Sequence, residues 1–373
     1  MSNNRYNIAP YELGIVIFSM VMGVGILTLP RALVVEIDTV DGWLSIAGSG
    51  LVMIILVFLY GRLQRCFPGK DFFDYIAGSQ GGRWLTYALA LLFSLYFISL
   101  LSYQARILAI VVKMYLLDQT PSEVLVAVIL LVTTYGVTKG IQGLVHLSLM
   151  FLPIIVFVLM VLLLANIPNM EVDRVLPVLP EGVMPVLAGM KETIFVFLGV
   201  EVVLYLMMYV KADAIRTLPL NISLAFVTVL YMLVFLACAS IFGSHALETI
   251  VFPTVEVVKE IEVPGAFFER LESAMITIWI MTIFNTMTFA QLLAYRSIKR
   301  HLLHDKNHRW LLATIVLIVF LTAFIPNSLE DLFIFGDVIG WFGLGLFVLS
   351  LLIGYLTVWY RKKKAKINRA EGV

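Results

Sequence analysis

The stretch Gly23-Val24-Gly25-Ile26-Leu27-Thr28-Leu29-Pro30 interrupts the first long apolar segment of the chain, which covers about residues 11–35. Two glycines this close together tolerate non-helical backbone and allow a ligand to approach it. Pro30 has no N–H to donate, and its ring clashes with the carbonyl of Ile26, four residues earlier. The same proline suits the first turn of a new helix that starts near Leu27. The pattern therefore predicts a helix, a break and a second helix within one segment.

The whole chain is unusually apolar. Of its 373 residues, 61% are hydrophobic and 14% are charged, whereas soluble domains are about 45–50% apolar and about 25% charged. This composition excludes a disordered chain, a coiled coil and a nucleic-acid-binding protein, and it argues against a soluble enzyme. Because lipid cannot satisfy free backbone groups, segments that span a membrane must be helical. We predict an all-α integral membrane protein with ten transmembrane helices, at about 11–35, 42–62, 84–112, 121–138, 141–166, 185–210, 217–243, 269–296, 310–326 and 334–360.

The distribution of Lys and Arg orients the chain, because basic residues concentrate in cytoplasmic loops. With the N-terminus in the cytoplasm, 19 of the 26 basic residues fall in cytoplasmic segments and 5 in outer segments. The formal net charge of +1 thus conceals a strongly polarised molecule. Ten spans leave both termini in the cytoplasm. Residues 1–373 are expected to form a single transmembrane domain that ends in a basic cytoplasmic tail, 361–373.

A second interruption is predicted in the sixth span, where Phe197-Leu198-Gly199-Val200-Glu201 lies near the centre. This signal is weaker, because it contains one glycine and no proline. Spans 1 and 6 each open a set of five, so the spans divide into two inverted repeats, at about 9–166 and 184–360. Interrupted helices at matching positions of inverted repeats indicate a transporter-type binding site near the midplane. The alternative is that the glycines serve only as close packing sites.

The ends of two broken helices suit a zwitterionic amino acid. A helix N-terminus offers free N–H groups and a positive dipole end to a carboxylate, whereas exposed carbonyls at a helix C-terminus suit an ammonium group. We expect the carboxylate at the backbone around Gly25–Leu27, with the Thr28 hydroxyl nearby. The ammonium group is expected at carbonyls near Phe197, together with Glu201.

Further motifs resemble a known family. They are Asp41-Gly42-Trp43, Tyr96-Phe97 with Gln104-Ala105-Arg106, and Val263-Pro264-Gly265 with Phe268-Glu269-Arg270. Together with the first motif, which continues into Arg31, they resemble the amino acid–polyamine–organocation superfamily of transporters. The resemblance is closer to the B subunits of bacterial spore germinant receptors, and it covers essentially the whole chain.

This resemblance implies a LeuT-like fold of two inverted repeats. It also implies a sensor of small nutrients, mostly amino acids, in the inner membrane of dormant spores. The implied partners are a membrane-embedded A subunit and a lipoprotein C subunit, besides the membrane lipid and the small-molecule amino acid. Composition and spacing alone indicate only a protein that resembles an amino-acid transporter.

Three polar side chains inside the spans each have two interpretations. Glu201 either caps the second half of its span or accepts an ammonium group or a proton. Tyr96 is either a core aromatic bonded to a neighbouring helix or a donor to a ligand carboxylate, and the resemblance favours the second role. Asn285 lies in the most polar span, whose side chains either line a cavity or hold helices together. The predicted ligand-binding residues are Gly23, Gly25, Ile26, Leu27, Thr28, Tyr96, Phe197, Gly199, Glu201 and Asn285.

Other polar residues point to no chemistry. Lys191, Glu192 and Arg106 fall in the outer halves of predicted spans, and we expect the charges within the membrane to pair with one another. The histidines near residues 301–308 lie in a basic loop without cysteine or a clustered set of carboxylates, so no metal site is predicted. Without a phosphate loop, a nucleophile elbow or paired catalytic carboxylates, we expect neither an enzyme nor a cofactor.

Two functions remain open from the sequence. A receptor subunit would bind an amino acid and signal to its partners with little flux. A proton- or sodium-coupled amino acid transporter would carry its substrate without partners. A scaffold with a vestigial pocket is a third possibility, and it would show no stabilisation by ligand.

Overall fold

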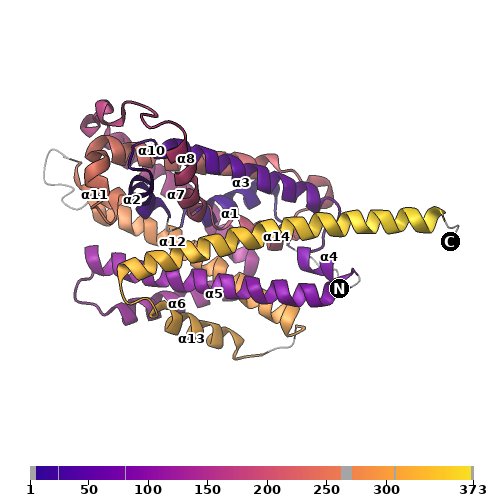
Figure 1. Ribbon diagram of the computed structural model, residues 1–373. Coiled ribbons are helices and arrows are strands. Elements are labelled where there is room, and N and C mark those ends of the chain that lie inside the picture. Colours follow the sequence, from indigo (N-terminus) through magenta and orange to yellow (C-terminus); the bar gives the residue numbers. More distant parts are fainter. Residues whose placement is uncertain (1–5, 24, 80, 262–270, 306–307, 371–373) are drawn as a thin grey trace.

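The computed structural model describes residues 6–23, 25–79, 81–261, 271–305 and 308–370. The motif at 263–270, the last three residues of the tail and Val24 lie outside the described residues. Within the described ranges every regular element is helical, and the helices form an elongated bundle (Figure 1). The first half contains α1 (Pro10–Val21), α2 (Gly25–Ile37), α3 (Gly42–Gln64), α4 (Phe72–Ala77), α5 (Gly82–Tyr115), α6 (Ser122–Thr138) and α7 (Gly140–Ala165).

The second half begins with two short 3-10 turns, η1 (Ile167–Asn169) and η2 (Val172–Val175). It continues with α8 (Met184–Val196), η3 (Val200–Val202), α9 (Val203–Leu206), η4 (Met207–Tyr209), η5 (Ala212–Ala214) and α10 (Leu218–Leu247). The last elements are α11 (Pro253–Lys259), α12 (Leu271–Arg296), the π-helical turn η6 (Ser297–Leu302), α13 (Leu311–Ala323) and α14 (Leu329–Ala370).

Six helices are long and apolar enough to cross a membrane: α3, α5, α7, α10, α12 with η6, and α14. The number rises to eight if each of two bent pairs counts as one span. The axes of α1 and α2 differ by 56°, and those of α8 and the segment 200–209 differ by 50°. The helix α6 and the helix α13 are apolar but shorter. The sequence thus locates most of the helix ends to within a few residues, with the C-terminal end of α14 as an exception, and the helix lengths show about six to eight candidate spans.

The outer surface of the bundle is apolar, as a lipid-facing surface must be. Leu51 on α3, Phe157 on α7 and Ile222 on α10 are 59%, 67% and 58% exposed. Such a surface would promote association in water. The described helices therefore form an integral membrane protein.

The polar helix α12 lies inside the bundle. Of its most apolar stretch, 78% is buried. The hydroxyls of Thr282 and Thr288 are satisfied within the helix, because they donate to the carbonyls of Ile278 and Phe284. Polar side chains on this helix are therefore tolerated in the interior without facing a cavity.

Both ends of the described chain lie at one end of the bundle (Figure 1). The N–H of Ile8 donates to the carbonyl of Tyr209 at 3.0 Å, and Arg361 donates to the carbonyl of Tyr75 at 2.7 Å. The short helix α4 lies at this same end (Figure 1). Its first turn is capped by the carboxylate of Asp71.

Candidate functional site

The carbonyls at the C-terminal end of α1 are satisfied by side chains from other helices. A helix end leaves its last carbonyls without intrahelical partners. Here three side chains from α10 and α12 supply donors: Tyr231 to Val21 at 2.7 Å, Trp279 to Gly23 at 3.2 Å and Thr286 to Ser19 at 3.2 Å. The end of α1 is therefore fixed within the bundle interior.

The helix α2 begins at Gly25, two residues earlier than the start predicted near Leu27. Pro30 consequently lies in the second turn, where its missing N–H leaves the carbonyl of Ile26 without its usual helical donor. The hydroxyl of Thr254, on α11, donates to that carbonyl at 2.6 Å. The first N–H groups of α2 also lack acceptors within the helix, and none of them bonds to a side chain among the described residues.

The second break is built around Gly199 and Glu201. Gly199 has φ of +113°, a backbone conformation that residues other than glycine rarely adopt. Glu201 is 1% exposed, and its two carboxylate oxygens accept the N–H of Gly199 at 3.1 and 2.9 Å. One of these oxygens also accepts the hydroxyl of Tyr96 at 2.6 Å. These contacts correspond to the capping interpretation of Glu201 and to the helix-linking interpretation of Tyr96.

A small cavity of about 20 Å³, the central cavity, lies between the two breaks. Its walls come from the end of α1, the start of α2, the middle of α5 and the end of α8. The lining residues are Met20, Val21, Gly23, Gly25, Leu100, Tyr103, Gln104, Phe195, Val196 and Leu198. A space of this size holds about one water molecule.

Gln104, which lines the central cavity, carries a polar atom without a partner among the described residues. The residue is 3% exposed, and its Oε1 accepts no hydrogen bond from the described residues. A buried amide oxygen without a donor carries a free-energy cost of about 1–3 kcal/mol. Gln104 therefore offers a free acceptor beside the first break.

A larger cavity of about 240 Å³, the outer cavity, adjoins the central one and is lined mainly by α2, α8 and α14. The two cavities share Tyr103, Phe195 and Val196. The rings of Tyr103 and Phe195 meet edge to face, with centroids 5.4 Å apart. These two rings close the central cavity on the side of the outer one.

The predicted pairing of charges within the membrane is wrong. Lys191 pairs with Glu36 on α2 at 3.2 Å rather than with Glu192, and Arg106 stacks on the ring of Phe324, 4.7 Å from its centroid. Glu192 lines the outer cavity beside Asp337. The reason is geometric. In the folded bundle, Lys191 and Arg106 each lie next to a residue of another helix and form their contacts with that residue.

The predicted ligand-binding residues lie in several places. Of these residues, Gly23 and Gly25 line the central cavity, and Thr28 lines the outer one. Phe197 packs its ring against Tyr231, with centroids 5.9 Å apart. The remaining residues are placed as follows: Ile26 and Leu27 are buried in α2, Tyr96, Gly199 and Glu201 form the second break, and Asn285 donates to Ser148 on α7 at 2.9 Å, outside the cavity lining.

Sequence reasoning missed the aromatic pair that closes the cavity, Tyr103 and Phe195, and the free acceptor of Gln104. Gln104 lies in one of the quoted motifs, and a buried amide on a transmembrane helix is a signal that points to function. Phe195 carries no comparable signal, because one aromatic among many apolar residues is ordinary.

We expect Gly25→Ala to lower the stability of the protein. The added Cβ would lie 2.5 Å from Cβ of Val196 and 3.1 Å from its Cα, and overpacking of this kind costs about 1–3 kcal/mol. The matched control is Gly23→Ala, whose Cβ would lie 3.4 Å or more from its nearest neighbours. Thermal unfolding in detergent should show a lower midpoint for Gly25→Ala alone; equal midpoints for the two variants would contradict the close approach of α2 to α8.

A model of the family described as "Spore germination protein" matches residues 7–332. The chain belongs to the spore germination protein family. Among its relatives, spore germination protein B2 of Bacillus subtilis (strain 168) is 28% identical over 97% of this chain and 98% of its own length. Spore germination protein GerLB of Bacillus cereus is 30% identical over 92% of this chain and 91% of its own.

Solved structures identify the fold of this germination protein as that of LeuT-like transporters. MhsT in complex with L-phenylalanine superposes with a TM-score of 0.68 and 14% identity, over 95% of this chain and 90% of that one. Mhp1, a nucleobase-cation-symport-1 family transporter in a closed conformation, has a TM-score of 0.58 and 13% identity, over 96% and 94% of the two chains. At 14% and 13% identity, these two likenesses concern the fold alone.

Proposed function

We propose that this chain is the amino acid-binding subunit of a spore germinant receptor. It binds a small zwitterionic amino acid in the central cavity and signals germination to a membrane-embedded A subunit and a lipoprotein C subunit. The family and the fold support this role. The observation that carries it is the central cavity, which is lined both by the start of α2 and by Gln104, a residue whose buried Oε1 has no donor among the described residues.

The proposal includes ten transmembrane spans in the inner membrane of the spore. The six long helices, the two bent pairs and the shorter helices α6 and α13 supply them. Two inverted repeats cover about 9–166 and 184–360 of a single domain, with spans 1 and 6 broken at the midplane, and the tail at 361–373 is cytoplasmic. The position of both chain ends at one end of the bundle supports this topology (Figure 1).

The ligand carboxylate binds at the first N–H groups of α2, those of Gly25–Leu27. These groups lack helical acceptors, and the positive end of the helix dipole favours an anion there. The ammonium group donates to Oε1 of Gln104, which lines the same cavity. This placement replaces Glu201 as the first ammonium partner, because the carboxylate of Glu201 already accepts the hydroxyl of Tyr96 and the N–H of Gly199.

Binding requires the cavity to expand, because about 20 Å³ does not accommodate an amino acid. The rings of Tyr103 and Phe195 separate it from the outer cavity, so their displacement opens a path to the ligand site. A ligand then favours the expanded arrangement through its contacts there. In a receptor, this shift is what reaches the partner subunits.

The test is ligand binding by the purified chain in nanodiscs, with a panel of amino acids. We expect at least one of them to raise the unfolding midpoint, and Gln104→Leu to weaken its apparent affinity at least tenfold, since a charged hydrogen bond is worth about 1.5–3 kcal/mol. The matched control is Gln119→Leu, at an exposed position. An unchanged affinity in Gln104→Leu would contradict the proposed site, and the absence of stabilisation by any amino acid would contradict the binding function.

Reconstituted liposomes separate the receptor from the alternative function, a proton- or sodium-coupled amino acid transporter, with which the fold is equally compatible. The receptor predicts binding with little uptake of labelled amino acid in the absence of partner subunits. Robust accumulation by this chain alone would establish the transporter instead.

A further inference from the structure

A third cavity lies at the end of the bundle that carries both chain ends. Its volume is about 530 Å³, and it is bounded by the junction of α6 and α7, by α9 and η4, and by the junction of α12 and η6. It shares no lining residue with the central cavity. We call it the basal cavity, and under the proposed topology it lies at the cytoplasmic surface of the membrane.

Two cations in the wall of the basal cavity have aromatic rather than acidic neighbours. Nη1 of Arg296 donates to the hydroxyl of Tyr209 at 2.8 Å, and the guanidinium lies 5.9 Å from the centroid of that ring. Nζ of Lys299 lies 5.5 Å from the ring centroid of Tyr295. Both cations are partly buried, and neither forms an ion pair with a carboxylate among the described residues.

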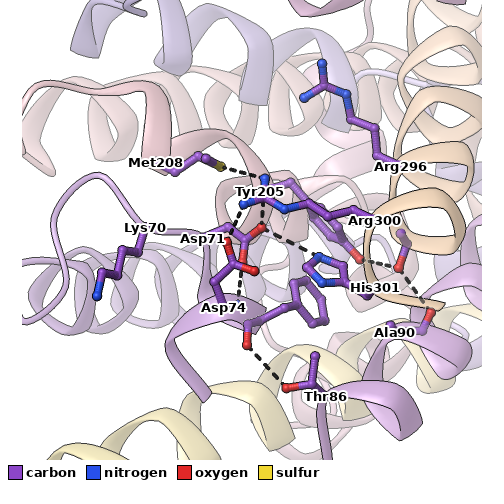
Figure 2. Close-up of polar contacts among 12 residues, drawn as sticks. Lys70, Asp71, Asp74, Thr86, Ala90, Tyr205, Met208, Arg296, Arg300 and His301 are labelled. Carbon is purple, nitrogen blue, oxygen red and sulfur yellow. Dashed lines mark hydrogen bonds and ion pairs between the residues drawn. The ribbon is translucent and has the colours of Figure 1, made fainter. Parts of the chain in front are cut away.

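The third cation, Arg300, is already neutralised. It pairs with Asp71 at 3.3 Å and with Asp74, and His301 lies 3.6 Å from the same Asp71 carboxylate (Figure 2). Burial raises the pKa of the Asp71 carboxyl, and the neighbouring His301 and Arg300 oppose that rise. Figure 2 shows Arg296 apart from this network, with its guanidinium directed away from Asp71.

The carboxylates of the cavity wall therefore leave Arg296 and Lys299 without a carboxylate partner among the described residues. Asp71 is occupied by Arg300 and His301, and Asp305, the other carboxylate of the lining, is an exposed residue. The π-helical turn η6 follows directly after Arg296 and contains both Lys299 and Arg300, so it connects the two cations to the network. Such turns occur often at functional sites.

The chemistry of this wall matches a phosphate group. Arginine and lysine bind phosphate oxygens through charged hydrogen bonds, and Tyr209 and Tyr295 line the same space. Apolar side chains, among them Leu292, complete the wall. Basic pockets between transmembrane helices at the cytoplasmic surface suit phospholipid headgroups.

We propose that the basal cavity binds a phosphate group through Arg296 and Lys299. Two sources have this chemistry, the headgroup of an anionic phospholipid at the membrane surface and free phosphate. The site is separate from the amino acid site, so phosphate binding there does not depend on amino acid binding, and only the lipid source rests on the topology proposed above.

The test measures binding to the full chain in a neutral detergent, by native mass spectrometry and by the unfolding midpoint. One arm titrates phosphatidylglycerol against phosphatidylcholine, and another titrates inorganic phosphate. We expect phosphatidylglycerol to bind at least tenfold more tightly than phosphatidylcholine, and the variant Arg296→Gln with Lys299→Gln to lose at least tenfold in affinity. If inorganic phosphate binds and is lost in the same variant while phosphatidylglycerol shows no preference, free phosphate is the ligand.

Two further variants make the test specific. The matched control, Lys362→Gln with Lys364→Gln, removes the same charge from exposed residues of α14 and should keep its affinity. The conservative variant, Arg296→Lys with Lys299→Arg, should bind even if the Gln variant folds poorly. Equal binding by wild type and the Gln variant, equal loss in the exposed control, or no binding in either arm would overturn the proposal.

Discussion

We expect Gly199→Ala to lower the stability of the protein more than the other glycine-to-alanine substitutions that we propose. Gly199 has φ of +113°, and its added Cβ would lie 2.8 Å from Cβ of Met20 and 2.9 Å from the backbone carbonyl of that residue. Backbone strain in such a conformation costs about 1–3 kcal/mol, and overpacking against a fixed neighbour costs about 1–3 kcal/mol more. We expect the thermal unfolding midpoint in detergent to fall, with a loss of expressed folded protein.

Two control variants separate the strain from the steric contact. Gly69→Ala places a methyl group at φ of +70° with no atom within 4 Å, so it measures strain alone. Gly345→Ala, in α14, also meets nothing within 4 Å and has no positive φ, so it should be neutral or slightly stabilising. If Gly199→Ala unfolds at the same midpoint as Gly69→Ala, the contact between the second break and the end of α1 does not constrain the fold.

The sequence predicts the positions of the helices well, because the length of an apolar segment decides them. The predicted segment 42–62 corresponds to α3, Gly42–Gln64, and the predicted segment 121–138 corresponds to α6, Ser122–Thr138. The predicted segment 334–360 is longer in the structure, where α14 covers Leu329–Ala370. Apolar length does not mark a helix that continues into a polar flank, so this end was missed.

The chemistry around the breaks was less predictable, because it depends on partners that are distant in the chain. The sequence suggests that Gly25 leaves room for a ligand, whereas the structure shows Val196 of α8 in that space. The carbonyl of Ile26 is freed by Pro30 as expected, but its donor, Thr254, is 228 residues away. Only the packing of helices across the bundle identifies such partners.

The same reason accounts for the charged residues. Lys191 and Glu192 are neighbours in the chain, yet Lys191 pairs with Glu36 on another helix. Adjacent residues on a helix point in different directions, so their proximity in sequence does not predict an ion pair.

The Glu201–Tyr96 hydrogen bond should couple the second break to α5, and its loss is the second large effect that we expect. Glu201→Ala leaves two buried donors, the hydroxyl of Tyr96 and the N–H of Gly199, without their acceptor. Each unsatisfied donor costs about 1–3 kcal/mol, so the unfolding midpoint should fall strongly. Tyr96→Phe removes one donor and should cost less, because Glu201 still accepts the N–H of Gly199.

A double-mutant cycle with Tyr96→Phe and Glu201→Ala measures the bond itself, because each substitution removes one of its two partners, and we expect a coupling of about 1 kcal/mol or more for residues in direct contact. The chain offers a matched pair near the surface, where Tyr115 donates to the partly exposed Glu256 at 2.8 Å. The same cycle there should give a smaller coupling, since water competes for both groups. A coupling near zero for the buried pair would contradict the linkage of the second break to α5 through Tyr96 and Glu201. If Glu201→Gln instead keeps its stability in the absence of ligand but no longer responds to the amino acid, the charge of Glu201 acts on the ligand, and the interpretation of Glu201 as an ammonium partner is restored.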